Sequence, residues 1–311
     1  MKNGNQNTSQ IVYLKNKDID KIKWDACITN ASNGLVYAYS FYLDTMSMHW
    51  DALILDDYKA VMPLTWKSKF SIHYLYQPFF AASLGVFGNQ LSLKIVRSFL
   101  ENIPAKFKYW DIYLNHKNIF QLKDFPFYER TNYVLNLAES YEKLSSAFSK
   151  SHLRNIARAT QSGCYSEKNI GVEEVIALAK QQSKKFSPVT DDDYERFLKL
   201  YKQLYKKNKA ITYGVFSKQK QLLASCVYFF SHNRAYYILV GNHPNGRTLG
   251  ASHFLINEFI KDNAGKDLLL DFEGSEIRNL AYFYSSFGAK EEKYAAIKLN
   301  KLPAILKLLK K

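Results

Sequence analysis

Cysteine, acidic residues and long apolar runs are scarce in this chain. Its three cysteines, Cys27, Cys164 and Cys226, lie far apart and without the Cys-x-x-Cys spacing of zinc sites, so neither a structural metal nor a disulfide framework is indicated. No apolar run approaches the ~20 residues of a membrane-spanning helix, and the polar N-terminus lacks a signal-peptide core. We therefore expect a cytoplasmic protein.

The shortage of acidic residues leaves the chain strongly basic. There are 28 Asp and Glu against 43 Lys and Arg, a formal net charge of +15. Residues 141–210 alone hold 14 basic against 8 acidic residues. Such a surface attracts polyanions, whether nucleic acid, anionic lipid, nucleotide or coenzyme A. High lysine content is also typical of an ordinary solvated surface, so charge alone does not choose among these partners.

Apolar residues, by contrast, make up 47% of the 311 residues, enough for two hydrophobic cores. Both halves show the same predicted order of a strand, two helices, three strands, a helix and a strand. The first half begins with a strand at residues 11–14, includes a strand at residues 58–66 and closes with strands at residues 109–114 and 132–137. The second half includes helices at residues 172–182, 191–208 and 276–287. Asp111 and Asp271 occupy matching places, 160 residues apart (271 − 111). This repetition predicts a duplicated domain, with residues 1–140 and 141–311 as the two copies.

The stretch from Val240 to Ser252 carries the clearest functional pattern. A predicted strand ends at Val240, a loop rich in Gly, Asn and Pro follows, and a helix is predicted from about Thr248 to Asp262. Unpaired N–H groups at a helix start can bind phosphate oxygens. The alternative is a turn that caps an ordinary helix.

Within this stretch, Arg247-Thr-Leu-Gly250-Ala-Ser252 resembles the Gln/Arg-x-x-Gly-x-Gly/Ala loop of the GNAT acyltransferases, with Ser at the last position. In that family the loop holds the pyrophosphate of acyl-coenzyme A. The resemblance implies an α/β fold with a mixed sheet, two tandem GNAT-like domains, and two parallel strands that splay apart. The first half has no equivalent loop, so its domain is expected to be degenerate. Acetyl-CoA or another acyl-CoA would contact Val240, Arg247, Leu249, Gly250, Ala251 and Ser252.

A second pattern lies between Asp271 and Gly288. In GNAT enzymes, a tyrosine four residues before a glycine protonates the departing thiolate, and Tyr284 and Gly288 keep that spacing. Tyr284 could equally be a packing residue of an amphipathic helix. Asp271 and Glu273 alternate along a predicted strand, so they face one side and could accept a proton from an amine. Their alternative roles are structural.

A third pattern is Arg154-Asn-Ile-Ala-Arg158, whose arginines lie on one face of a helix and could hold a phosphate or carboxylate of the substrate. This run resembles a segment of the FemAB-like ligases, tandem GNAT proteins that transfer amino acids from aminoacyl-tRNA to cell-wall precursors. Those ligases carry a lysine where this chain has Tyr284, and a coiled-coil arm that is missing here. A solvated basic face is the alternative.

These patterns predict an N-acyltransferase that moves an acyl group, acetyl as the first choice, from acyl-CoA to a small-molecule or peptidoglycan-precursor amine. The alternatives are a FemAB-type transferase that uses aminoacyl-tRNA, and a GNAT-like protein that binds ligand without catalysis. Acceptor, acyl chain length and oligomeric state leave no signal in the sequence.

Overall fold

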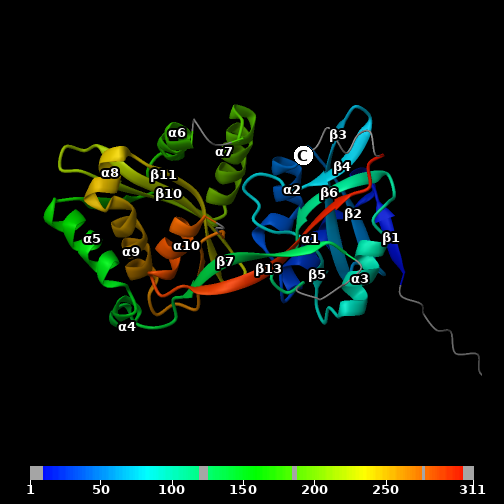
Figure 1. The fold of residues 1–311 in the computed structure, drawn as a ribbon, viewed down its shortest axis with the longest axis horizontal. Coiled ribbons are helices and arrows are strands. Elements are labelled where there is room, and N and C mark those ends of the chain that lie inside the picture. Colours follow the sequence, from blue (N-terminus) through cyan, green and yellow to red (C-terminus); the bar gives the residue numbers. More distant parts are fainter. Residues whose placement is uncertain (1–9, 119–124, 184–187, 275–276, 304–311) are drawn as a thin grey trace, which may run out of the picture. The chain divides into compact units, whose positions relative to one another are not determined.

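The computed structural model describes residues 10–118, 125–183, 188–274 and 277–303 (Figure 1). The chain divides into two compact units, residues 1–130 with 293–311, and residues 131–292. We call them unit 1 and unit 2 and describe each by itself.

Unit 1 is a mixed sheet with helices on both faces. Its strand order is β1-β2-β3-β4-β6-β13, with β5 paired to β3. Val96, Phe99 and Leu100 of α3 pack into the core of one face. On the other face Trp24 of α1 lies 5.1 Å from Trp50 of β2, ring centre to ring centre. The elements are β1 (Ile11–Leu14), α1 (Lys21–Asn30), α2 (Ser40–Met46), β2 (His49–Leu55), β3 (Ala60–Lys69), β4 (Ile72–Tyr76), β5 (Phe87–Gly88), α3 (Leu93–Glu101), β6 (Phe107–Tyr113), β13 (Lys290–Asn300) and the 3-10 turns Asn16–Asp18 and Val36–Ala38.

Unit 2 repeats this design with the strand order β7-β12-β11-β10-β9-β8. Helices α6 and α7 cover one face, and α9 and α10 pack on the other, with α5 outside α9 (Figure 1). The elements are β7 (Phe127–Asn136), α4 (Tyr141–Ser146), α5 (Lys150–Gln161), β8 (Tyr165–Lys168), α6 (Val172–Ser183), α7 (Asp191–Tyr205), β9 (Ala210–Phe216), β10 (Leu222–Ser231), β11 (Arg234–Asn242), α8 (Pro244–Leu249), α9 (Ala251–Asn263), β12 (Leu269–Asp271) and α10 (Arg278–Ser285).

The two units share one topology, which confirms the repeat predicted from the sequence. In each, four antiparallel strands are followed by a parallel pair, β4 with β6 and β11 with β12. The register keeps the predicted offset. Tyr76 pairs with Asp111 and Tyr236 with Asp271, and both members differ by 160 (236 − 76 and 271 − 111).

The sixth strand of each sheet comes from the other half of the chain. We predicted a strand at residues 132–137 that closes the first half, but β7 pairs with β12 of unit 2. The last strand, β13, pairs with β6 of unit 1. The compact units therefore break near residues 130 and 292, whereas a domain boundary at 140–141 stays a prediction.

Local chemistry explains most helix starts. Asp20, Ser92, Ser149 and Thr190 each accept a backbone N–H at the start of α1, α3, α5 and α7, and Thr190 forms a capping box with Asp193. The predicted strand at residue 58 begins at Ala60 instead, because Tyr58 has a φ of +58° and belongs to the turn. The start predicted for the last helix, Glu276, lies outside the described residues.

Candidate functional site

The parallel strands β11 and β12 pair over three residues only, after which β12 ends while β11 continues. Their register begins with Arg234 opposite Leu269 and ends with Tyr236 opposite Asp271, where β12 stops. β11 continues to Asn242 and stays paired with β10 on its other edge. Within the described residues, the edge of β11 that faces β12 therefore has no ladder partner beyond Tyr236.

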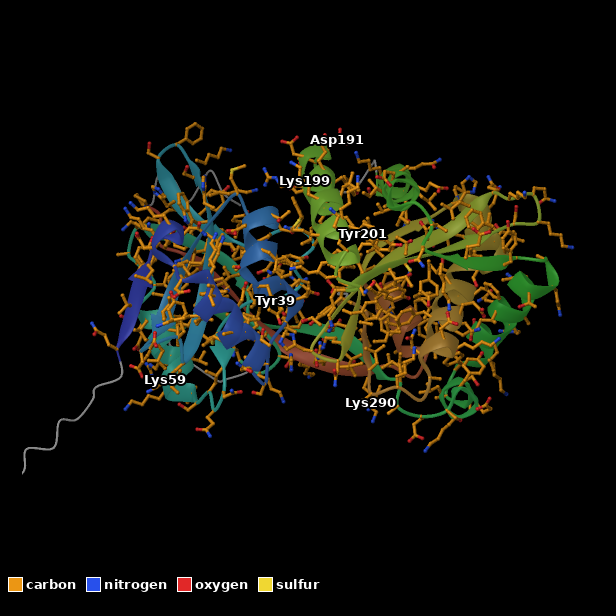
Figure 2. The ribbon with its side chains drawn as sticks, turned by 180° about the vertical axis from the view of Figure 1, so that it is seen from behind. Tyr39, Lys59, Asp191, Lys199, Tyr201 and Lys290 are labelled. Carbon is orange, nitrogen blue, oxygen red and sulfur yellow. The ribbon has the colours of Figure 1, made fainter. Side chains whose placement is uncertain are left out.

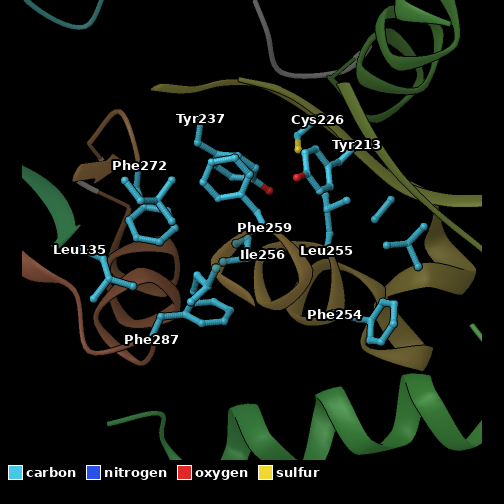
Figure 3. Packing of buried hydrophobic residues seen from close by; sticks show 14 of the residues in the cluster. Leu135, Tyr213, Cys226, Tyr237, Phe254, Leu255, Ile256, Phe259, Phe272 and Phe287 are labelled. Atoms are coloured by element: carbon cyan, nitrogen blue, oxygen red, sulfur yellow. The ribbon is translucent and has the colours of Figure 1, made fainter. Parts of the chain in front are cut away.

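Aromatic side chains fill the space where the strands part. Phe272 follows β12 directly and stacks on Tyr284 of α10 at 4.6 Å between ring centres. Tyr237 of β11 meets Phe272 edge-on at 6.1 Å (Figure 3). Tyr284 is 7% exposed, and burial followed by the nearby Glu273 carboxylate raises the pKa of its hydroxyl. Tyr284 is thus a protonated core residue at neutral pH, a position that suits packing. Its hydroxyl has a proton to donate, but the raised pKa makes it a weaker acid than a free tyrosine.

The predicted glycine loop is largely helical, which corrects the predicted loop at residues 242–252. Pro244 occupies the first turn of α8, and Nδ1 of His243 accepts the N–H of Asn245 at 3.2 Å. Gly250 then adopts a left-handed φ of +79° between α8 and α9. Its N–H donates to the carbonyl of Arg247 at 3.4 Å.

The residues predicted to contact an acyl-CoA differ in their surroundings. Val240, Leu249 and Ala251 pack in the unit 2 core, and Ala251 is fully buried. Arg247 is exposed. The Ser252 hydroxyl donates to Oδ1 of Asn242 at 2.5 Å, so it holds the end of β11 against the start of α9.

Helix α5 lies against this loop and brings one of the two predicted substrate-binding arginines, Arg158, close to it. Nη1 of Arg158 donates to the carbonyl of Thr248 at 3.2 Å, and Arg154 is exposed on the same helix. A Cβ added to Gly250 would lie 2.5 Å from the carbonyl oxygen of Asn155. The backbone of α5 therefore occupies the space directly in front of Gly250.

Two histidines join α5 to the helices beneath it. The rings of His152 on α5 and His253 on α9 lie 4.5 Å apart, and Nε2 of His152 is 2.9 Å from the carbonyl oxygen of Phe283. Nε2 of His253 lies 3.3 Å from Nδ2 of Asn155. Burial, with smaller contributions from His152 and Arg158, lowers the pKa of His253 to about 4. The sequence patterns did not single out either histidine, although His152 lies two residues before Arg154 and His253 follows Ser252 directly.

Both carboxylate oxygens of Asp271 take part in a buried network of ion pairs and hydrogen bonds. Its Oδ2 accepts Nη1 of Arg234 at 2.6 Å, and its Oδ1 accepts the amide of Asn132 and the N–H of Glu273, each at 2.8 Å. Arg234 also bonds Glu292, at 2.8 and 2.9 Å. Nothing in the sequence pointed to this pairing, because the partners come from four separate strands or strand ends.

Glu273 differs from Asp271 in both exposure and backbone. It is partly exposed and has a φ of +65°, so it does not continue the alternation of β12, which ends at Asp271. The prediction that the two carboxylates share a strand face is therefore wrong. Glu273 nevertheless lies close enough to Tyr284 to raise the pKa of the phenol.

Two absences hold for the described part of the chain. It contains no group of three or more His, Cys, Asp or Glu side chains arranged to bind a metal ion. It also contains no helix long and apolar enough to span a bilayer.

Comparison with known proteins defines the fold. No model of a known family and no curated protein sequence matches the chain. Among solved structures, FemX superposes with a TM-score of 0.66 and 14% identity over 97% of this chain and 99% of FemX. A conserved protein of unknown function from Bacteroides thetaiotaomicron gives 0.59 and 13%, over 94% and 100%. The DUF2156 C-terminal domain of an Agrobacterium fabrum protein named as a lysylphosphatidylglycerol synthetase gives 0.56 and 12%, over 94% and 96%.

These likenesses show that the chain has a FemX-like fold of two tandem GNAT-like domains, as the sequence predicted. At such low identity the shared fold does not identify the substrate or the acyl donor of this chain.

Proposed function

We propose that this chain is an N-acyltransferase that moves an acyl group, acetyl in the simplest case, from acyl-CoA to an amine. The early end of β12 carries the proposal, because the edge of β11 beyond Tyr236, which has no strand partner on that side among the described residues, could align an extended acyl arm. The left-handed Gly250 at the start of α9 and the exposed Arg247 beside it support a binding place for the pyrophosphate.

The reaction would need one acceptor and one donor of protons. The amine attacks the thioester carbonyl, the C–N bond forms, and the C–S bond breaks. Glu273 would accept the proton from the amine, and Tyr284 would donate a proton to the departing thiolate. Because Asp271 already accepts hydrogen bonds from three partners, we assign it to holding Glu273 through the N–H of that residue.

Replacing Tyr284 by Phe tests the proposed acid. Loss of a general acid lowers turnover by about 10²–10⁴-fold. The ring and its stacking on Phe272 are kept, so the affinity for acyl-CoA and the melting temperature should change little. Tyr228→Phe, at a fully buried tyrosine of β10, is the control and should retain full activity. Single-turnover acyl transfer measures both. Equal turnover in Tyr284→Phe and wild type would leave Tyr284 a packing residue.

A second candidate is transfer from an aminoacyl-tRNA, as in the FemAB-like ligases. One observation favours it: the Asn155 carbonyl lies where a pyrophosphate would approach Gly250. With α5 in this position, acyl-CoA could lie only beside Arg247 and Arg158, or bind after α5 moves away. A donor held by a large polyanion on the basic surface needs no such movement.

Thermal shift and calorimetry with defined donors separate these candidates. Acetyl-CoA, free coenzyme A, aminoacyl-tRNA and uncharged tRNA are added to the full chain, since a ligand of the native state raises its melting temperature. A shift with both CoA compounds that Arg247→Ala weakens, and that Arg97→Ala in unit 1 does not, supports the first proposal. A shift with tRNA alone supports the second. Binding of either donor without turnover would indicate a non-catalytic protein.

A further inference from the structure

The turn that joins β3 to β4 presents an aromatic side chain to solvent. Phe70 is 84% exposed. It forms a two-residue turn with Ser71, and φ is positive at both, +50° and +60°. Asn and Gly are the usual residues of such a turn, because bulky side chains disfavour positive φ. Neither the hydrophobic effect nor the turn geometry explains a phenylalanine at this tip.

Two lysines lie just before the exposed ring, on one face of β3. Lys67 and Lys69 are opposite Tyr74 and Ile72, and Nζ of Lys69 lies 5.5 Å from the centre of the Phe70 ring. Neither lysine makes an ion pair with a described residue. The surrounding sequence offers no compensation either, because residues 58–100 contain no Asp or Glu.

We propose that this hairpin tip docks the protein reversibly on an anionic phospholipid surface. Phenylalanine favours the boundary between headgroups and acyl chains, and lysines reach phosphates while their alkyl stems lie on apolar surface. Charge complementarity selects the partner, since an apolar tip that docked on a protein core would not require two lysines without ion pairs beside it. The contact is a shallow anchor, independent of the proposed chemistry in unit 2.

Vesicle sedimentation tests the anchor with the full chain. We expect binding to vesicles of phosphatidylglycerol and phosphatidylcholine, weakened by salt and absent with phosphatidylcholine alone. Phe70→Ser should weaken binding about tenfold, and Lys67→Glu with Lys69→Glu about twentyfold or more. Ile22→Ser is the matched control, since Ile22 is also 84% exposed in unit 1. Lys59→Glu is the charge control, at the opposite end of β3 (Figure 2).

A gain of signal tests insertion itself. Phe70→Trp should show a blue-shifted emission on addition of anionic vesicles, beyond the background of the natural tryptophans, whereas Ile22→Trp should not. No binding to anionic vesicles, or equal losses in Phe70→Ser and Ile22→Ser, would overturn the proposal. The proposal would also be overturned if Lys67→Glu with Lys69→Glu lost vesicle binding while Phe70→Ser bound as wild type and the emission of Phe70→Trp did not shift. The attraction would then be electrostatic only.

Discussion

The buried ion pairs of unit 2 depend on one side chain, Arg234. It is 8% exposed and bonds both Asp271 and Glu292. Desolvation alone would lower the pKa of this guanidinium, but the two carboxylates outweigh it and raise the pKa. A buried carboxylate without a partner costs far more than the pair contributes. The sequence predicted Asp271 as a functional residue, but a carboxylate in a predicted strand does not indicate which distant side chain it will pair with.

Replacing Arg234 by Met should therefore destabilise unit 2 strongly. Two carboxylates would stay buried without their cation, and such losses cost about 3–5 kcal/mol in the free energy of unfolding. Arg247→Met, at an exposed arginine, should stay within about 0.5 kcal/mol of wild type. Urea unfolding measures both. Adding Asp271→Asn and Glu292→Gln to Arg234→Met should restore part of the lost free energy of unfolding, because no unpaired carboxylate then stays buried. A stable single variant would contradict the ion-pair assignment.

At the scale of elements, α5 is held against the glycine loop, and two glycines test that contact. Gly250 and Gly265 have the same backbone conformation, φ of +79° and +78°. An added Cβ meets Asn155 at 2.5 Å in the first case and nothing within 4 Å in the second. Gly265→Ala should cost about 1 kcal/mol for the left-handed conformation alone. Gly250→Ala should cost clearly more. Equal melting temperatures would mean that α5 does not rest on the loop.

This geometry also changes which variants can test donor binding. A bulky residue at Gly250 displaces α5 whether or not a pyrophosphate binds there, so lost binding in Gly250→Val would have two explanations. Arg247 is exposed and lies on the same helical turn, which makes Arg247→Ala the more informative variant.

The contact between α5 and α9 should also make stability depend on pH. Burial, His152 and Arg158 lower the pKa of His253 to about 4, below the ~6.5 of an unfolded histidine. Between these values the unfolded chain binds more protons, so the free energy of unfolding falls as pH drops from about 6.5 to 4. His253→Gln should flatten this part of the profile. His232→Gln, outside the cluster, is the control. Parallel profiles for wild type and His253→Gln would contradict the prediction.

The elements themselves were largely predictable, because caps and apolar periodicity are local. Helices at residues 172–182 and 191–208 and the strand at residues 11–14 agree with α6, α7 and β1 to within three residues. Helix α8 was missed because Pro-Asn-Gly indicates a turn unless Pro takes the first helical position. The position of α5 over Gly250 had no local signal, since it depends on contacts nearly 100 residues apart.

At the scale of the whole molecule, the duplication was predictable and the strand exchange was not. A repeated order of elements appears directly in the sequence, and the 160-residue offset holds in the register of the parallel pairs. The apolar face of β13 does not reveal in the sequence that this strand will pair with β6. That pairing depends on distant contacts, such as the N–H of Leu114 donating to the carbonyl of Ala295 at 2.8 Å.

A charge placed on β13 should show which half of the chain that strand stabilises. Ile297 is fully buried in the unit 1 core, while its neighbour Lys298 is exposed. Ile297→Asp buries an unpaired carboxylate, so hydrogen exchange should accelerate in β2, β3 and β6 of unit 1. Lys298→Asp should leave these amides protected. Suppose instead that the chain divided at residues 140–141 and that its last strand stabilised the second half. Ile297→Asp would then accelerate hydrogen exchange in β10 and β11, while the amides of β2 and β3 stayed protected. If the amides of both sets of strands lost their protection together, the two units would unfold as one. Neither the division near residues 130 and 292 nor the division at residues 140–141 would then describe the stability of the chain.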